Sequence, residues 1–191
     1  MTRPALRLAS ILSAVALATA PSFAGALVPF AVQVPLMLKA LTYDRTLKAR
    51  VGDQVRIAVI VPPKAGRDAT EELLASISAL PDRTLNGMPV VFKEIVATDE
   101  AALDLALRSG RWAAAYVMPG FKADEMAQVK HVCASRQILA VAALVDDLDR
   151  GMALAVGAQG GKPQIVVNLA STKACGSEFD LALLRLARVI Q

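Results

Sequence analysis

The sequence is poor in the side chains that most often carry chemistry. Its 191 residues include one histidine, two cysteines and one tryptophan, and aromatic residues make up only 4% of the chain. The single histidine, His131, cannot build a multi-histidine metal site. So few aromatics argue against a groove that stacks sugars or bases, and no basic cluster alternates with aromatics, so nucleic-acid binding is not expected.

Long apolar runs are also missing after the first residues, which have a pattern of their own. Two arginines precede a short apolar run over residues 8–20, and Ser22 and Ala24 occupy the −3 and −1 positions of a small-residue cleavage site. This pattern is typical of a secretory signal peptide, whereas a membrane anchor needs about 20 apolar residues and a proline interrupts this run. We expect residues 1–24 to be removed, leaving residues 25–191 as one exported domain with a small positive charge.

The two cysteines are Cys133 and Cys175. An exported chain meets an oxidising compartment, and an even count favours one disulfide between them. Such a bond serves either as a redox switch or as a structural staple. We favour the staple, because no further thiol is present to resolve a catalytic cysteine.

A search for reaction centres finds only partial motifs. The stretch GAQGGKP lacks the first glycine of a phosphate-binding loop, and Pro163 replaces its hydroxyl residue. His131 and Cys133 are two residues apart on a predicted helix and therefore do not face each other. The acidic turn at residues 146–149 lacks the length and glycine of a calcium loop. We predict no catalytic residues, no metal and no cofactor, so the chain is not expected to be an enzyme.

Apolar runs alternate with helical patterns along the chain. The expected strands are QVRIAVIV (54–61), MPVVFKEIV (88–96), WAAAYVMPG (112–120), QILAVAALV (137–145), GMALAVG (151–157) and KPQIVVNLA (162–170). Strands that alternate with helices indicate βαβ units. We predict a three-layer α/β/α sandwich with a mainly parallel sheet, a C-terminal hairpin through AQGG, and a closing helix.

Capping residues set the expected helix starts. Pro35 suits the first turn of the first helix, and Asp68 with Glu71 forms a capping box for the second. Thr98 is the expected cap of the third. Ser177 is expected to cap a closing helix that continues to Ile190 and docks one face on the sheet.

The C-terminal stretch RGMALAVGAQGGKPQIVVNLASTKACGSEFDLALLRLARVI and the opening VPLMLKALTYDRTL resemble the YfiR-like family of exported bacterial proteins. That family closes with a glycine-led strand, a turn containing Gly-Lys or Gly-Arg, a strand ending in Asn, and a helix with LLxLA character. The positions that match are Gly151, Gly161, Lys162, Asn168, Ala170, Leu183, Leu184, Leu186 and Ala187.

The resemblance implies a periplasmic α/β/α sandwich that often forms homodimers. It also implies that the protein binds the periplasmic part of a membrane-bound diguanylate cyclase and restrains it, which lowers cyclic-di-GMP and biofilm output until envelope or redox stress releases it. We therefore predict an exported, non-catalytic regulator of an inner-membrane signalling protein. The first helix and the Cys133/Cys175 region are the candidate interfaces.

A small-molecule binding protein is the alternative. Parallel α/β sheets bind ligands beyond the carboxyl ends of their strands. The loops expected there hold Lys64, Arg67 and Lys122 next to helix N-termini, where they would receive an anion. The other explanation of these three residues is that they are ordinary solvated loop charges.

Overall fold

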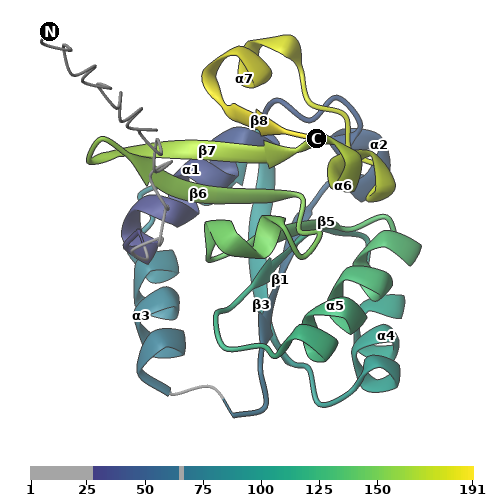
Figure 1. Ribbon diagram of the computed structural model, residues 1–191. Helices are drawn as coiled ribbons and strands as arrows, with labels where there is room; N and C mark the ends of the chain where they lie inside the picture. The colour runs from purple at the N-terminus through teal and green to yellow at the C-terminus, as the bar shows by residue number, and fades with distance from the viewer. Residues whose placement is uncertain (1–27, 65–66) are drawn as a thin grey trace, which may run out of the picture.

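The computed structural model describes residues 28–64 and 67–191, so the predicted signal peptide lies outside the described residues. The chain forms an eight-stranded sheet with helices on both faces (Figure 1). The strands are β1 (Val55–Val61), β2 (Thr84–Leu85), β3 (Met88–Val96), β4 (Trp112–Val117), β5 (Leu139–Ala142), β6 (Leu154–Gln159), β7 (Lys162–Asn168) and β8 (Arg188–Ile190). The helices are α1 (Phe30–Leu41), α2 (Leu47–Val51), α3 (Arg67–Ser78), α4 (Glu100–Arg108), α5 (Ala123–Ser135), the 3-10 helix η1 (Val145–Leu148), α6 (Leu169–Ala174) and α7 (Leu181–Leu186).

The strand order across the sheet is β2-β3-β1-β4-β5-β6-β7-β8. The five strands from β3 to β6 in this order are parallel to one another. β2 is antiparallel to β3, β7 is antiparallel to β6, and β8 is parallel to β7. The mainly parallel sheet and its C-terminal hairpin are as predicted from the sequence.

Helices α1 and α3 pack on one face of the sheet, and α4 and α5 pack on the other (Figure 1). β1 shows why both faces are covered, because its side chains alternate between two cores. Ile57 and Val59 are buried on the α1–α3 side, whereas Ala58 and Ile60 are buried on the α4–α5 side. The three-layer α/β/α architecture predicted from the sequence is therefore confirmed.

Alanines on the strands face larger side chains of the helices on the α4–α5 side. Half of the strand residues in this core are alanines: Ala58, Ala115, Ala140, Ala142 and Ala155. Leu103 and Leu107 on α4 and Met126 on α5 fill the space opposite. Alanine on the strands lets the bulky helix residues approach the sheet closely, which gives the high alanine content of the sequence a packing role.

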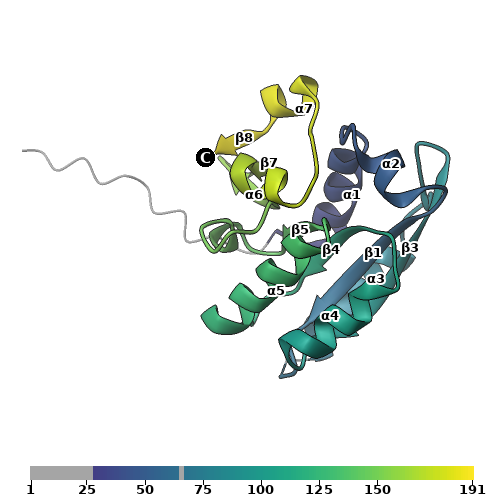
Figure 2. The same ribbon diagram turned by 90° about the vertical axis from the view of Figure 1, so that its right-hand side faces the viewer.

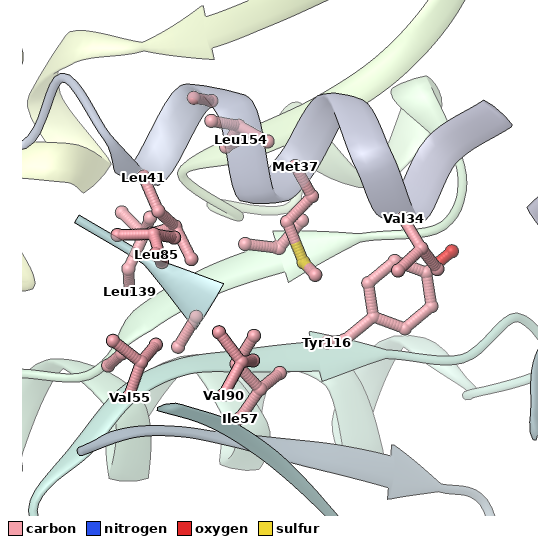
Figure 3. Close-up of a cluster of buried hydrophobic side chains, with 14 of the residues drawn as sticks. Val34, Met37, Leu41, Val55, Ile57, Leu85, Val90, Tyr116, Leu139 and Leu154 are labelled. Carbon is pink, nitrogen blue, oxygen red and sulfur yellow. The ribbon is translucent and has the colours of Figure 1, made fainter. Parts of the chain in front are cut away.

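Helix α1 is fixed to the other face by apolar packing and one buried polar chain. Figure 3 shows Val34, Met37 and Leu41 pointing from α1 toward the sheet. The buried Tyr116 hydroxyl donates to Gln33 Oε1 at 2.8 Å, and Gln33 Nε2 donates to the Val28 carbonyl at 2.6 Å. Each polar atom in this chain is satisfied, so the chain orients α1 without leaving a buried polar group unpaired.

The start of α1 differs from the sequence expectation. The helix begins at Phe30, so Pro35 lies inside it and not in its first turn. An interior proline removes one backbone hydrogen bond and costs about 3 kcal/mol. Phe30 and Val34 are fully buried, and their packing outweighs that loss.

Two predicted caps are also wrong by one or two residues. Helix α3 begins at Arg67, which places Asp68 inside the first turn and not at the cap. Helix α4 is capped by Asp99 and not by Thr98, because Asp99 Oδ1 accepts the Ala102 N–H at 2.8 Å. A carboxylate at this position also interacts favourably with the positive end of the helix dipole.

The predicted closing helix from Ser177 to Ile190 is wrong. The segment forms α7, capped by Asp180, and then the edge strand β8. β8 pairs in parallel with the last three residues of β7, from Val166 to Asn168, and covers a part of the sheet edge that would otherwise be open. The β-branched Val189 and Ile190 suit this strand.

Two tight turns close hairpins in the sheet. Gly160 and Gly161, with φ of 57° and 76°, join β6 to β7 as predicted. Asn86 and Gly87, with φ of 52° and 78°, join β2 to β3, and this hairpin was not predicted. Both turns need positive φ at two successive residues, which Asn-Gly and Gly-Gly tolerate.

Candidate docking site

A groove of about 470 Å³ lies between α1, the β6–β7 hairpin and α7, and we call it the α1–α7 groove. Its apolar lining consists of Leu36, Tyr43, Pro163, Ile165, Leu183 and Leu186. Its polar lining consists of Lys39, Gln159, Lys162 and Gln164. A cleft of this size with a mainly apolar lining matches the general character of binding sites in proteins.

Helix α7 is attached to the first part of the chain by its N-terminal side. Arg45 donates from Nε and Nη2 to Asp180 Oδ2 at 3.1 and 2.9 Å. The Asp180 N–H donates to the Tyr43 carbonyl at 2.9 Å, and Asp180 Oδ1 accepts the Ala182 N–H at 2.8 Å. These contacts hold the start of α7 against the segment that follows α1. Figure 2 shows α6, α7 and β8 together at one end of the molecule.

The buried ion pair between Arg50 and Asp44 also stabilises the attachment of α7. Arg50 Nη2 donates to Asp44 Oδ2 at 2.5 Å and to the Ser177 hydroxyl at 2.9 Å. Arg50 Nη1 donates to the carbonyls of Ala113 and Gln137, at 3.2 and 3.1 Å. One guanidinium therefore ties together the segment after α1, the sheet and the segment before α7. Ser177, which was expected to cap the closing helix, belongs to this network.

The leucines of α7 divide into buried and exposed sets. Leu183 is buried in the core under α1, whereas Leu181 is 61% exposed and Leu186 is 74% exposed. Because α7 has fewer than two turns and is fixed at Asp180, it buries only part of the apolar surface that its sequence LALLRL carries. Leu186 therefore lines the groove while remaining open to solvent.

Positive charge borders the groove. Lys39 Nζ lies 5.5 Å from the centroid of the Tyr43 ring, close enough for a cation–π contact. Lys162 lies at the start of β7, beside the turn of the hairpin. No aspartate or glutamate lines the groove, and among the described residues neither lysine forms an ion pair with a carboxylate.

The residues of the anion-binding alternative lie at the carboxyl ends of β1 and β4. The loops after these strands meet there, since a Cβ added to Gly120 would lie 3.6 Å from Pro62 Cγ. Arg67 lines a cavity of about 370 Å³, but Glu71 and Glu94 line it too. Lys64 and Lys122 are exposed and do not contribute to that lining. Of the three basic residues, only Arg67 therefore lines this cavity.

Cys133 and Cys175 are both buried, and in the structure both are free thiols. Burial raises the pKa of Cys133, and the neighbouring Cys175 raises it further. Burial also raises the pKa of Cys175, although the Ala140 backbone and Arg50 act in the opposite direction. The two thiols are thus close but not joined, and the disulfide stays a prediction.

His131 and the acidic turn lie apart from any shared centre. The His131 side chain is exposed on α5, with Nε2 3.7 Å from Glu100 Oε1, whereas Cys133 is buried. In the turn, Asp147 is buried and accepts from Arg150 Nη1 at 3.1 Å; burial raises its pKa. Among residues 28–64 and 67–191, no group of three His, Cys, Asp or Glu side chains is placed to hold a metal.

The residues that carry the family resemblance have local structural roles. Asn168 Oδ1 caps α6 by accepting the Ser171 N–H at 3.0 Å. Gly151 has φ of 94°, and a Cβ there would lie 2.5 Å from Lys130 Cε. Gly161 forms the hairpin turn, and Lys162 follows it in the groove lining. Leu184 and Ala187 are half-buried against the α1–α3 core.

The groove was not predicted from the sequence, which named the first helix only as a general interface candidate. One signal was present, because the hexapeptide LALLRL carries leucine on more than one face of a helix. The groove itself depends on three segments that the fold brings together from distant parts of the chain. Within the described residues, no helix combines the length and apolar character that a membrane span requires.

Comparisons with known proteins identify the fold but no family. Neither the scan against protein-family models nor the search of curated proteins finds a match. A conserved domain protein from Vibrio cholerae has a similar solved structure, with a TM-score of 0.59 and 14% identity over 85% of this chain and 60% of that one.

Two further solved structures are similar. An ABC domain in complex with L-Trp from Streptococcus pneumoniae has a TM-score of 0.56 and 13% identity over 85% of this chain and 62% of that one. A ligand-free substrate binding protein with adhesive properties from Clostridium difficile has a TM-score of 0.50 and 15% identity over 76% and 57%. The chain therefore spans about 60% of the length of these proteins.

Proposed function

We propose that this protein is an exported, non-catalytic regulator that binds and restrains an inner-membrane signalling protein, a diguanylate cyclase by the family resemblance. The partner's periplasmic part would dock on the α1–α7 groove and the exposed leucines of α7. This proposal combines the resemblance carried by the C-terminal sequence with the surface that the fold builds from that same sequence.

The observation that carries the proposal is the exposure of Leu186 in the lining of a groove that is already mainly apolar. Leu186 is 74% exposed at the C-terminal end of α7, and Leu181 is 61% exposed at its N-terminal end, next to Asp180, which Arg45 holds. Covering a fully exposed leucine contributes about 1.5–3 kcal/mol. Exposed apolar side chains beside an apolar groove are typical of protein–protein interaction sites.

Pre-organisation supports the same function. The Arg45–Asp180 pair and the Arg50–Asp44 network fix α7 before any partner arrives. A surface that is already ordered loses little conformational entropy on binding, so more of the contact energy appears as affinity.

The alternative function is binding of a small solute at the loops that follow the carboxyl ends of β1 and β4. It is supported by the cavity beside Arg67, and by a fold shared with a substrate binding protein and with a domain that holds L-Trp. The two glutamates in that cavity, and the separation of Lys64 and Lys122 from it, favour an anion less than the sequence suggested. A ligand at 100 times its dissociation constant would stabilise the protein by about 2.7 kcal/mol, which a thermal-shift screen detects.

The proposed function is tested by replacing Leu186→Glu in the chromosomal copy and measuring cellular cyclic-di-GMP. Leu105→Glu is the matched control, since Leu105 is 66% exposed but lies on α4, on the opposite face of the sheet. We expect deletion of the gene and L186E both to raise cyclic-di-GMP, while L105E leaves it unchanged. If deletion itself leaves cyclic-di-GMP unchanged, the cyclase assignment is wrong.

A further inference from the structure

We propose that the α1–α7 groove also binds a small molecule, a single-chain amphiphilic anion. Its carboxylate would lie between Lys39 and Lys162, and its alkyl chain would lie along Leu36, Ile165 and Leu183. This inference stands on the lining of the groove alone and goes beyond the regulatory function proposed above.

The charge of the lining selects an anion. Lys39 and Lys162 are its two ionised groups, both are positive, and no carboxylate lines the groove. Among the described residues, neither ammonium is neutralised by an ion pair, so a ligand carboxylate would not compete with an existing partner. Gln159 and Gln164 add amide donors at the same rim. A charge-assisted hydrogen bond to a carboxylate is among the stronger polar contacts available to such groups.

The floor of the groove is lined by aliphatic side chains, which favours a ligand with an apolar body. Leu183 is buried, and Leu36 and Ile165 are half-buried, so one side of each is already packed against the protein. The polar groups lie on the hairpin and at Lys39, which places charge at the rim and hydrocarbon at the floor. A straight alkyl chain fits this division because its favourable transfer from water needs no directional contacts.

The volume argues for one small ligand rather than a lipid surface. The groove measures about 470 Å³, within the range of about 300–1,000 Å³ typical of small-molecule sites. A bilayer would meet the exposed end of α7 but would not enter a cleft between a helix and a hairpin. The proposed ligand is therefore a free, monomeric single-chain carboxylate.

The test uses the purified exported protein and a homologous series of carboxylates from hexanoate to decanoate, each below its micellar concentration. Calorimetric titration gives the affinity, and amide chemical shifts locate the site. Each added methylene should tighten the dissociation constant by about two- to fourfold. Decanol and decyltrimethylammonium, which share the chain but lack the anion, should bind at least about fivefold more weakly than decanoate.

Variants tie the affinity to the groove. The double variant Lys39→Ala, Lys162→Ala should weaken decanoate binding by about three- to twentyfold, while decanol binding stays within about twofold. Lys93→Ala removes an exposed lysine from β3, outside the groove, and should change neither. Both lysines of the double variant are exposed, so it should retain the melting temperature of the parent.

Three results would overturn this inference: decanol binding as tightly as decanoate, affinity independent of chain length, or shift changes confined to residues outside the α1–α7 groove. None of them depends on a partner protein, so the groove can fail as a ligand site while the regulatory proposal stands. Conversely, normal cyclic-di-GMP in L186E cells would leave carboxylate binding in the purified protein unaffected.

Discussion

The side-chain carboxylate of Asp44 is fully buried, and both of its oxygens accept hydrogen bonds. Its Oδ1 accepts from the Thr46 N–H and hydroxyl and from the Glu178 N–H, and its Oδ2 accepts from Arg50. Burial alone would raise the pKa of Asp44, but the Thr46 hydroxyl, the Arg50 guanidinium and the Glu178 N–H together lower it below its ordinary value. The ionised form is thus the one that the fold stabilises.

Replacing Asp44→Asn should destabilise the protein by about 3–5 kcal/mol at neutral pH, because it leaves the Arg50 charge with no buried partner. The depressed pKa of Asp44 means that its contribution is complete above the unfolded value, near pH 4, and is lost as the pH falls through the lower folded value. Urea unfolding at neutral and acid pH should therefore show the gap between parent and D44N narrowing below about pH 4.

Asp53→Asn is the control for this prediction. Asp53 pairs with Lys48 at 2.7 Å, but its side chain is 99% exposed. D53N should unfold at nearly the same urea concentration as the parent. Equal midpoints for D44N and D53N at neutral pH would show that the buried ion pair does not anchor the closing segment.

Cys133 and Cys175 yield a second prediction at the residue scale. Because both thiols are buried with raised pKa values, neither should react with iodoacetamide in the folded protein. We predict that the exported protein joins them, so that unfolding without reductant exposes no reactive thiol and reduction lowers the melting temperature. Mass spectrometry showing two alkylated cysteines after unfolding without reductant would rule out the disulfide.

The segment from Ser177 to Ile190 combines an anchor and an exposed surface. Phe179 and Leu183 are 6% and 1% exposed in the α1–α3 core, and Asp44 forms a backbone bridge with Phe179. Leu181 and Leu186 stay in solvent on the same short helix. The side chains that anchor this segment in the core are therefore different from those that we propose for docking.

Phe179→Ala should cost about 3–5 kcal/mol of unfolding free energy, since it leaves a cavity beneath α1. Leu186→Ala, in the same C-terminal segment, should change the unfolding free energy by no more than about 0.5 kcal/mol. Chemical denaturation of both variants checks this directly, and truncation from Ser177 should abolish the folded state. A folded, cooperative protein lacking residues 177–191 would remove this segment from the core.

Element by element, the sequence was most informative where a pattern is repeated over many residues. The apolar run of β1 and the Gly160–Gly161 turn were predicted because burial on both faces and positive φ each leave a clear local signal. Helix starts were missed by small shifts, because Thr98 and Asp99 are both good caps and only tertiary packing chooses between them. The dipeptide Asn86–Gly87 is a typical hairpin turn and could have predicted the β2–β3 hairpin.

β8 shows a different limit of sequence reasoning. Its residues continue the helical apolar pattern of α7, so local preference alone favours a longer helix. The open edge of β7 decides otherwise, and that edge exists only once the hairpin has formed. The sequence pattern of one segment does not show whether that segment will extend a helix or pair with a strand that is distant in the chain.

At the scale of the whole molecule, the strand order determines where sites can form. The chain runs from β1 to β3 on one side and returns to β4 on the other, which brings the loops at Pro62 and Gly120 together as the sequence suggested. The α1–α7 groove arises at the far edge of the sheet, from segments at both ends of the described chain. Sequence reasoning found the first location, which follows from βαβ topology, but not the second, which depends on how the closing segment packs.

The most direct test of this account is photo-crosslinking from position 186 in the protein's own cells, with a crosslinker at position 105 as the control. Both positions are exposed leucines on helices of opposite faces. We expect position 186, but not position 105, to capture an inner-membrane protein that carries a cyclase or kinase output domain. Equal capture from both positions, or capture of a transporter permease from position 186, would contradict it.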